Sequence, residues 1–323
     1  MNLGTKLFLL AWRAIDKFPE SLVRTLAMGV SDLMWLRRGK GVRRLESNLR
    51  RVRPKAGPRY LRRLSRMGMR AYTRYYIDAF RLRSFSADQI RARCRVEGRE
   101  RLDETFAAGK SAVLGLGHIG NWDLAGAYAS LEISPVTTVA ERLNPPEVFD
   151  AFLEFRQCLG MEIFALGDEG VVRGLLSALR RPPRIVPLLF DRDLSHNGVE
   201  VEFFGEPARM AKGPAVIALA GKSPLFPVTF YHERLRGAAR KAAGSPWGMV
   251  LQIHPEIVPG EGDREAQIHS MIQRCADSLA EEIAKRPWEW HMLQRVFTAD
   301  LDAPPPVITG GRDSSAPKPT TKS

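Results

Sequence analysis

The chain has 323 residues, of which 44% are hydrophobic and 26% charged, so it is long enough for one large α/β domain and too apolar for a disordered chain. Its formal net charge is +13. The three cysteines, Cys94, Cys158 and Cys275, are odd in number and far apart, which argues against a disulfide framework and a CxxC metal site and favours a reducing compartment.

The positive charge is concentrated in the first part of the chain. The first hundred residues hold 25 Lys and Arg against 8 Asp and Glu, and between Arg37 and Arg70 the only acid is Glu46. Such a patch attracts polyanions, either nucleic acid or an anionic membrane leaflet. The alternative interpretation is a solvated face of ordinary helices.

The apolar residues from Leu3 to Leu36 recur at intervals of three and four, which predicts an amphipathic helical stretch. None of its runs reaches the ~18 uncharged apolar residues of a spanning helix, and no small-residue cleavage site follows Leu7–Trp12. The sequence has no zinc-finger, RNP-like or Walker pattern that would favour nucleic acid. We therefore predict that residues 1–95 form a basic, amphipathic helical region at an anionic membrane surface.

Beyond residue 95, apolar runs of strand length alternate with helical segments. We expect strands at 111–117, 135–140, 161–166, 184–190, 199–204, 224–232 and 249–254. We expect helices at 121–131, 147–159, 169–180, 213–221 and 264–286. This order predicts an α/β core over 96–301, with a central mixed, mostly parallel sheet flanked by helices. Residues 302–323, rich in Pro, Gly, Ser and Thr, predict a disordered tail.

A polar cluster follows the strand expected at 111–117. His118 is placed at the carboxyl end of that strand, the edge of an open α/β sheet where ligands bind. Asp123, five residues later, is close enough around a turn to reach the imidazole. A histidine with its ordinary pKa of ~6.5, oriented by a carboxylate, suits general-base catalysis at neutral pH. The alternative is a turn or capping histidine.

Three motifs carry a resemblance to a known family. They are the His-x4-Asp of His118 and Asp123, the block FFGEPARMAKGPA at 203–215 and the block PLFPV at 224–228. In this order and spacing they resemble the glycerolipid acyltransferase superfamily, and within it the branch shared by bacterial lipid A late acyltransferases and actinobacterial phosphatidylinositol mannoside acyltransferases. The resemblance covers about residues 5–300.

Three details make the chain more similar to the mannoside group. It has Asp123 where lipid A enzymes usually carry Glu, and TVAERLNPP and PWEWHMLQ resemble the actinobacterial pattern. The resemblance implies transfer of a long-chain acyl group, commonly palmitoyl, from acyl-CoA to a mannose hydroxyl of a phosphatidylinositol mannoside. It places a peripheral or monotopic protein at the cytoplasmic face of the plasma membrane, with no metal and no cofactor beyond the co-substrate acyl-CoA.

Two alternatives stay open at this point. A lipid A type late acyltransferase would use the same catalytic core on a lipid disaccharide. A non-catalytic membrane or nucleic-acid binding protein would explain the basic first third of the chain but gives no reason for the His118 turn.

The resemblance also implies roles for single residues. His118 would deprotonate the acceptor hydroxyl, which attacks the thioester without a covalent acyl-enzyme. The acid that completes a dyad in the mannoside group corresponds to Asp191, whereas Asp123 orients His118 or organises the turn. Glu141 would grip sugar hydroxyls or support the dyad. The partner of His118 is therefore Asp123, Glu141 or Asp191.

Other residues are expected to bind substrate. Arg156 matches a family arginine near the donor thioester or phosphates, and Arg192 and Arg209 suit phosphate contacts. Asn121 and the backbone amides of 117–121 are expected at the developing oxyanion. His291 is either a site residue or a packed structural histidine.

The affinity for the donor is expected to come from its acyl chain. Burial of a palmitoyl tail at ~0.8 kcal/mol per methylene gives roughly 11 kcal/mol before ordering costs, more than a single phosphate contact supplies. We therefore expect a deep apolar tunnel, lined from the segments near Leu124, Tyr128 and Phe149.

Overall fold

The computed structural model describes Trp12 and residues 14–142, 145–193 and 197–301. The predicted tail over 302–323 and the first part of the predicted amphipathic stretch, residues 3–11, lie outside the described residues.

In the part of the chain that the structure describes, seven strands form a central sheet in the order β1-β9-β8-β2-β5-β3-β4. Neighbouring strands are parallel except β8 and β9, so β1 and β9 run opposite to the other five. This sheet confirms the predicted fold class. Its strands are β1 (Cys94–Glu97), β2 (Ala112–Leu116), β3 (Val136–Ala140), β4 (Met161–Ala165), β5 (Ile185–Leu189), β8 (Leu225–Arg234) and β9 (Trp247–Ile253).

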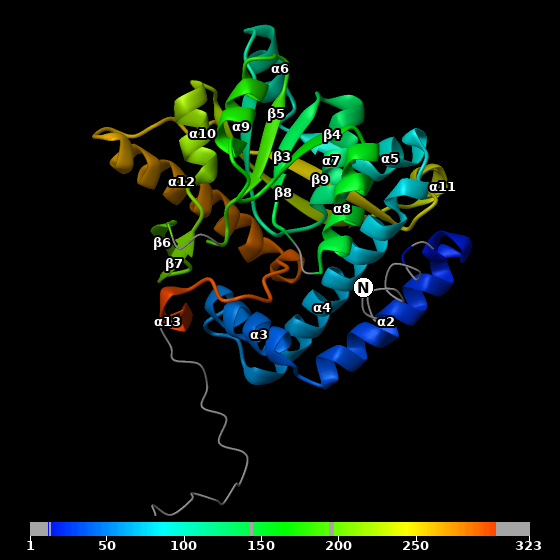
Figure 1. Ribbon diagram of the computed structural model, residues 1–323. Coiled ribbons are helices and arrows are strands. Elements are labelled where there is room, and N and C mark those ends of the chain that lie inside the picture. The colour runs from blue at the N-terminus through cyan, green and yellow to red at the C-terminus, as the bar shows by residue number, and fades with distance from the viewer. Residues whose placement is uncertain (1–11, 13, 143–144, 194–196, 302–323) are drawn as a thin grey trace, which may run out of the picture.

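Helices cover both faces of the sheet (Figure 1). On one side lie α9 (Val171–Leu179), α10 (Gly213–Gly221) and α12 (Arg264–Lys285), and on the other lie α5 (Ala87–Arg93), α7 (Trp122–Glu132) and α8 (Pro146–Cys158). The residues of β2 alternate between the two sides. Gly117, just after β2, allows close packing with α12, because a Cβ there would lie 2.7 Å from the side chain of Leu279.

The predicted strands and helices are all present, and a few elements were not predicted. The strand expected at 199–204 is β6 (Val199–Phe203), which pairs with β7 (Glu206–Met210) in a separate two-stranded antiparallel hairpin. The unpredicted elements are short, and β7 contains Pro207, a residue that argues against a strand. They are β1, β7, α6 (Glu100–Ala107), α11 (Gly237–Ala243), the 3-10 helix η3 (Pro287–Glu289) and the terminal turn α13 (Thr298–Leu301).

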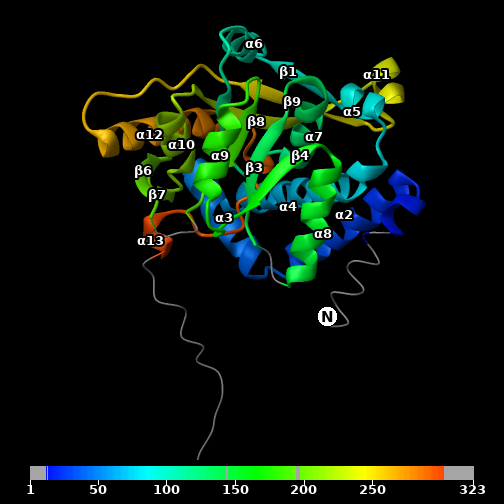
Figure 2. The ribbon, with the colours of Figure 1, turned by 45° about the horizontal axis from the view of Figure 1, so that its top comes forward.

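The first part of the chain forms helices that pack against the core at one end of the sheet (Figure 1, Figure 2). They are α2 (Glu20–Leu36), α3 (Lys40–Val52) and α4 (Pro58–Arg81), preceded by η1 (Ile15–Lys17) and followed by η2 (Leu82–Ser84). Helix α4 begins with Pro58 at its first position, where a missing N–H costs no hydrogen bond. α4 packs on α2 and α3, and it also contacts α7.

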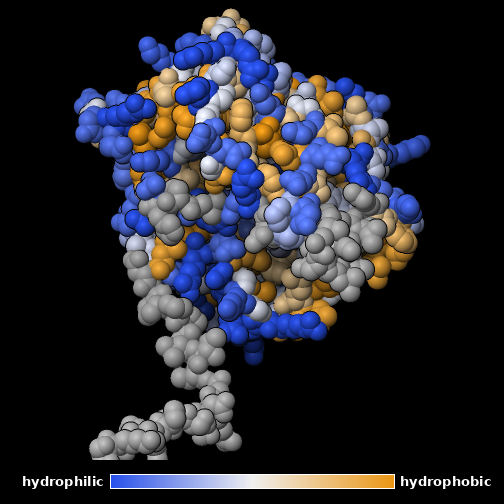
Figure 3. All heavy atoms as spheres, in the orientation of Figure 1, coloured by the Kyte–Doolittle hydropathy of each residue, from blue (hydrophilic) through white to orange (hydrophobic). Residues whose placement is uncertain are grey.

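Helix α2 turns its polar side inward. Arg24 donates to Glu20 and Asp78, and a second buried arginine, Arg93, also pairs with Glu20. The opposite face of α2 exposes large apolar side chains, with Leu26 and Leu36 each 63% exposed. The exposed set on and beside this helix comprises Phe18, Leu22, Leu26, Val30, Leu33, Met34 and Leu36. Figure 3 shows hydrophobic side chains at the surface along the edge where Figure 1 places α2.

Candidate active site

The turn that follows β2 carries His118 at the edge of the sheet. Asn121 ends the turn as the N-cap of α7, its side-chain oxygen accepting the backbone N–H of Leu124 at 3.0 Å. Gly120 has a φ of 62° and passes so close to β8 that a Cβ would lie 2.6 Å from the Cβ of Phe230. The local sequence therefore fixes the position of His118.

The imidazole of His118 contacts Asp191, which follows β5. Its Nδ1 lies 2.6 Å from Oδ1 of Asp191, while Oδ2 accepts the backbone N–H of His118 at 2.9 Å and the indole N–H of Trp290 at 3.1 Å. Burial opposes ionisation of Asp191, but the His118 imidazole and these hydrogen bonds outweigh it and hold the pKa of Asp191 below its usual value. Among the described residues nothing hydrogen-bonds Nε2 of His118, whose ring lines a cavity.

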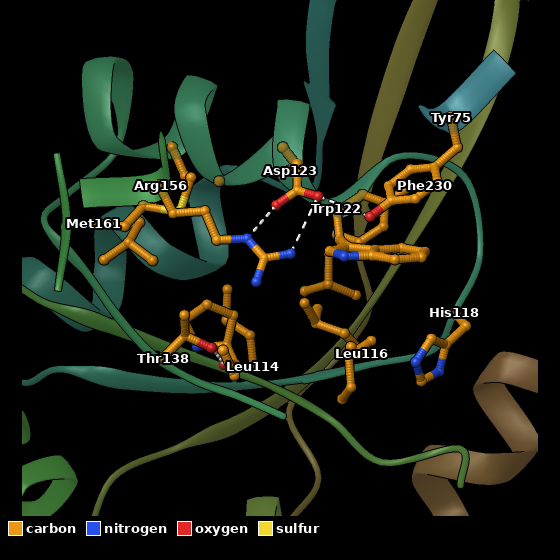
Figure 4. Close-up of a pocket in the computed structure, with 18 of the residues that line it drawn as sticks. Tyr75, Leu114, Leu116, His118, Trp122, Asp123, Thr138, Arg156, Met161 and Phe230 are labelled. Atoms are coloured by element: carbon orange, nitrogen blue, oxygen red, sulfur yellow. Dashed lines mark hydrogen bonds and ion pairs between the residues drawn. The ribbon is translucent and has the colours of Figure 1, made fainter. Parts of the chain in front are cut away.

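Asp123 does not contact His118. It forms an ion pair with Arg156 of α8, with Oδ1 2.6 Å from Nε, and its Oδ2 accepts the hydroxyl of Tyr75 at 2.8 Å (Figure 4). Burial and the Asp123 carboxylate raise the pKa of Tyr75 well above its usual value, so the phenol remains a donor. Of the three acids considered as the partner of His118, the structure places Asp191 there and Asp123 elsewhere.

A cavity of about 810 Å³ extends from His118 along the face of the sheet covered by α7. Its size lies within the range of ligand pockets. Six strands of the sheet contribute side chains, and those of β9, β8, β2 and β5 alternate along the strand. They are Leu251 and Ile253 of β9, Val228 and Phe230 of β8, Leu114 and Leu116 of β2, Ile185, Pro187 and Leu189 of β5, Val136, Thr138, Val139 and Ala140 of β3, and Met161 of β4. The part of the cavity away from His118 is therefore apolar.

Small side chains on α7 leave room for this cavity. Ala125, Gly126 and Ala129 line it, and a Cβ on Gly126 would lie 2.9 Å from the side chain of Met161. The expectation that the cavity is lined from the segments near Leu124, Tyr128 and Phe149 is confirmed, because α7 and α8 both border it. α7 and α8 turn those three away and present instead, besides the α7 residues above, Val148, Phe152 and Arg156 of α8.

Aromatic side chains surround the His118 end of the cavity. Tyr72, Tyr75 and Tyr76 of α4 line it together with Trp122, whose ring centroid lies 5.4 Å from that of His118. The rings of Tyr75 and Trp122 contact each other at a tilt of 31°, with centroids 4.1 Å apart. The charged Arg156 lies across this part of the cavity from His118 (Figure 4).

His291 is both packed and part of the cavity lining. Its backbone N–H donates to the carbonyl of His118 at 2.7 Å, and its Nε2 donates to the carbonyl of Gly120 at 2.9 Å. Burial, partly offset by the carboxylate of Glu289, lowers the pKa of His291 to about 4, so the ring is neutral at pH 7.

The remaining predicted residues divide into two groups. Glu141 and Arg192 line the cavity and form an ion pair at 2.6 Å. Asn121 is buried as a helix cap and Arg209 lies on the β6–β7 hairpin, and neither is among the residues that line the cavity. The structure therefore does not bring Asn121 or Arg209 to the expected substrate contacts.

Three of the five backbone amides expected to form an oxyanion hole, those of His118, Ile119 and Gly120, already donate hydrogen bonds within the protein. The N–H of His118 donates to Asp191, that of Ile119 to the carbonyl of Gly117 at 2.8 Å, and that of Gly120 to the carbonyl of Glu289 at 3.0 Å. For these three amides the expectation is wrong, because their N–H groups donate to acceptors in the turn, in Asp191 and in the segment that contains Glu289.

Two features of the site were not predicted. Trp290 lies in the quoted PWEWHMLQ motif, yet nothing in its spacing relates it to Asp191, which is 99 residues away. Tyr75 lies on a helix of the basic region, where helical periodicity alone indicates packing.

Comparison with known proteins is consistent with this geometry. Residues 2–299 match the family described as bacterial lipid A biosynthesis acyltransferase. The chain belongs to this lipid A biosynthesis acyltransferase family. It is 36% identical over 293 residues to the phosphatidylinositol mannoside acyltransferase of Mycolicibacterium smegmatis, covering 90% of each chain. It is also 36% identical over 296 residues to the phosphatidylinositol mannoside acyltransferase of Mycobacterium tuberculosis, covering 90% of this chain and 87% of the other.

The membership makes this chain an acyltransferase. In this member of the family, no helix within the described residues is long and apolar enough to span a membrane. Nor does the described part of the chain contain a group of three or more His, Cys, Asp or Glu residues arranged to hold a metal ion.

Proposed function

We propose that the protein transfers a long-chain acyl group, such as palmitoyl, from acyl-CoA to a mannose hydroxyl of a phosphatidylinositol mannoside, with His118 as the general base. The observation that carries this proposal is the position of the His118–Asp191 pair at the polar end of a largely apolar cavity. The names of the mycobacterial relatives support the choice of acceptor.

The chemistry needs only His118, which lines the cavity, and Asp191, which is buried beside it. The Asp191 carboxylate accepts a hydrogen bond from Nδ1–H of His118, which leaves Nε2 as the basic nitrogen. Nε2 takes the proton of the sugar hydroxyl while the hydroxyl oxygen attacks the carbonyl carbon of the thioester. The tetrahedral intermediate collapses with cleavage of the C–S bond, and the imidazolium returns the proton to the departing thiolate of CoA. Because the thioester is already activated, no resident cofactor is needed.

The apolar part of the cavity suits the acyl chain of the donor. Each buried methylene contributes ~0.8 kcal/mol, so a palmitoyl tail supplies roughly 11 kcal/mol before ordering costs. The apolar strand residues that line the cavity offer that burial across six of the seven strands of the sheet. The thioester then lies at the His118 end, where the cavity becomes polar.

The polar end of the cavity suits a sugar phosphate acceptor. Carboxylates such as Glu141 accept hydrogen bonds from hydroxyl groups, and the guanidinium of Arg192 matches a phosphate or a developing oxyanion. The faces of Trp122 and Tyr76 provide apolar area for a sugar ring. We propose Glu141 and Arg192 as contacts of the acceptor.

The exposed face of α2 supports a membrane location. An apolar helix face flanked by the basic stretch Arg37–Arg70 suits the interface of an anionic leaflet, where each cation contributes ~1 kcal/mol. Both proposed substrates reside in or partition into membranes. We propose that the protein binds peripherally at the cytoplasmic face of the plasma membrane.

A second acceptor follows from the family match, whose description names lipid A biosynthesis. In that case the same catalytic pair would act on a lipid disaccharide. The test incubates the purified protein with palmitoyl-CoA and either phosphatidylinositol dimannoside or a tetraacylated lipid A disaccharide, and identifies products by mass spectrometry. We expect one added palmitoyl group on the dimannoside only, lost in His118→Ala. Acylation of the disaccharide alone would replace the proposed acceptor, and activity retained by His118→Ala would overturn the proposed base.

A further inference from the structure

The residues that follow α12 run alongside the turn that carries His118. The backbone N–H of Gly120 donates to the carbonyl of Glu289 at 3.0 Å, and the backbone N–H of His291 donates to the carbonyl of His118 at 2.7 Å. The two segments thus form an antiparallel bridge. A segment more than 160 residues later in the sequence fixes the backbone of His118.

Trp290, in the middle of this segment, reaches the acid of the dyad. Its indole N–H donates to Oδ2 of Asp191 at 3.1 Å, the oxygen that also accepts the backbone N–H of His118. The Trp290 side chain is fully buried and packs edge-on against Phe203, with ring centroids 5.7 Å apart. Each oxygen of Asp191 is therefore held by His118, and the indole adds a third donor from a separate part of the chain.

A buried charge anchors the segment next to Trp290. Glu289 lies 2.8 Å from Nδ1 of His232 on β8 and 3.7 Å from the guanidinium of Arg74 on α4. That guanidinium also lies 3.7 Å over the ring of Trp247. Burial opposes ionisation, but His232 and Arg74 lower the pKa of Glu289 to about 2, so it is charged at pH 7. A buried charge with these partners permits little movement of the segment.

We propose that Trp290 is a positioning residue for the dyad: its indole N–H holds the Asp191 carboxylate where Oδ1 meets Nδ1 of His118, and Glu289 keeps Trp290 in place. The inference rests on the proposed function, because the orientation matters to catalysis only if His118 is the base. By donating to the carboxylate, the indole N–H also stabilises the negative charge of Asp191. It thereby limits how tightly the carboxylate holds the imidazolium of His118.

The test compares Trp290→Phe with the same substitution at Trp288. Phenylalanine keeps most of the apolar volume at position 290 and removes the N–H. Trp288 is partly buried against a separate core cluster and serves as the matched control. We expect Trp290→Phe to lower kcat roughly 10- to 100-fold, as loss of a supporting hydrogen bond does at other sites, with KM for palmitoyl-CoA little changed. Trp288→Phe leaves both parameters unchanged.

The pH profile separates positioning from general destabilisation. With one donor fewer, Asp191 holds the proton of the His118 imidazolium more tightly, so the acidic limb of kcat moves to higher pH in Trp290→Phe. The other ionisable groups that line this cavity are His291, the phenols Tyr72, Tyr75 and Tyr76, the Arg192–Glu141 pair and the Asp123–Arg156 pair. Trp290→Phe and Trp288→Phe both leave these groups in place, so a shift of the pH limb seen only in Trp290→Phe does not come from them.

Two further measurements keep the inference falsifiable. If Trp290→Phe does not fold, β-(3-benzothienyl)alanine at position 290 keeps the shape of indole and replaces the N–H by sulfur. The tautomer of His118, read by ¹⁵N NMR of histidine-labelled protein, reports positioning without activity: we expect a proton on Nδ1 in the wild type and a mixture of tautomers in the variant. An unchanged tautomer or an unmoved pH limb overturns the role of Trp290, whereas absence of acyl transfer by the wild type defeats the proposed function instead.

Discussion

Asp123 and Arg156 form an ion pair that joins the start of α7 to the end of α8 across one wall of the cavity, with Oδ1 and Nε 2.6 Å apart. The Asp123 side chain is 2% exposed and that of Arg156 is 19% exposed. Burial opposes the charge of Arg156, yet the carboxylate prevails and raises its pKa above the usual value. The second acid of the His-x4-Asp motif therefore binds a cation and leaves His118 to Asp191.

We predict that Asp123→Asn destabilises the fold, because it leaves the Arg156 guanidinium without its counter-charge. Removal of one partner of a buried pair costs about 3–5 kcal/mol. Urea unfolding measures the change in the free energy of unfolding. Asp103→Asn is the matched control, since its pair with Arg99 is exposed and such pairs contribute less than about 1 kcal/mol. Equal, small effects at both positions would show that the Asp123 pair is not a structural tie.

Asp191→Asn is predicted to act on catalysis. An amide at this position no longer fixes the tautomer of His118, and loss of the corresponding acid from a serine protease triad lowers kcat about 10⁴-fold. We expect a decrease of similar order in acyl transfer, measured with saturating palmitoyl-CoA. Glu141→Gln provides the comparison, because Glu141 contacts Arg192 and not the imidazole. A larger loss of kcat in Glu141→Gln than in Asp191→Asn would reverse this assignment.

The sequence predicted the central sheet well because its strands are apolar runs bounded by turn residues, and each such run reflects burial in the core. His118 was found for the same reason, since a polar residue directly after β2 is placed at the ligand-binding edge. Its partner was left open among Asp123, Glu141 and Asp191. Local spacing favours Asp123, the resemblance to the mannoside group implies Asp191, and the pairing of β2 with β5 brings Asp191 beside the imidazole.

The cavity lining shows the same limit at finer detail. The sequence predicted the helices α7 and α8. Which face of each helix borders the cavity depends on how the helix is rotated about its axis, and the small residues on α7 determine which of its faces leaves space. Gly126 and Ala129 leave the space, whereas Leu124 fills the core on the other side. The contribution of Tyr75 could not be read from the sequence, because it depends on the packing of α4 against α7.

The pKa of His291 predicts a pH dependence of stability. In the folded state it is lowered from 6.5 to about 4, so the neutral ring is favoured and its contribution is complete above the unfolded value. That contribution is lost as the pH falls from about 6.5 to 4, and at ~1.4 kcal/mol per pH unit it amounts to about 3 kcal/mol. We expect His291→Gln, which keeps a donor for the carbonyl of Gly120, to flatten this part of the curve of unfolding free energy against pH. A curve of unchanged slope in the variant would exclude His291 as the source.

The width of the cavity under α7 predicts the acyl-chain preference. Ala129→Leu places extra side-chain volume in the apolar part of the cavity, so long chains no longer fit beyond that point. We expect kcat/KM for palmitoyl-CoA to fall at least tenfold while that for octanoyl-CoA stays within about twofold, since even 1–3 kcal/mol of overpacking suffices for such a change. A parallel loss with both donors would show that the helix is displaced and that the cavity does not hold the acyl chain at Ala129.

The exposed face of α2 predicts how the protein binds membranes. Leu26→Glu puts a negative charge at the centre of the apolar face without touching the inward ion pairs of Arg24. We expect it to abolish sedimentation with vesicles of phosphatidylglycerol and phosphatidylcholine, because it removes apolar burial and repels the anionic surface. Val258→Glu, at an equally exposed apolar residue away from α2, is the matched control and should bind as the wild type does. Serine in place of Arg66 and Arg70, both half-exposed, should weaken binding at low salt and have little effect at 1 M salt, where the Debye length is ~3 Å. Equal binding by Leu26→Glu and the wild type would rule out α2 as the membrane face.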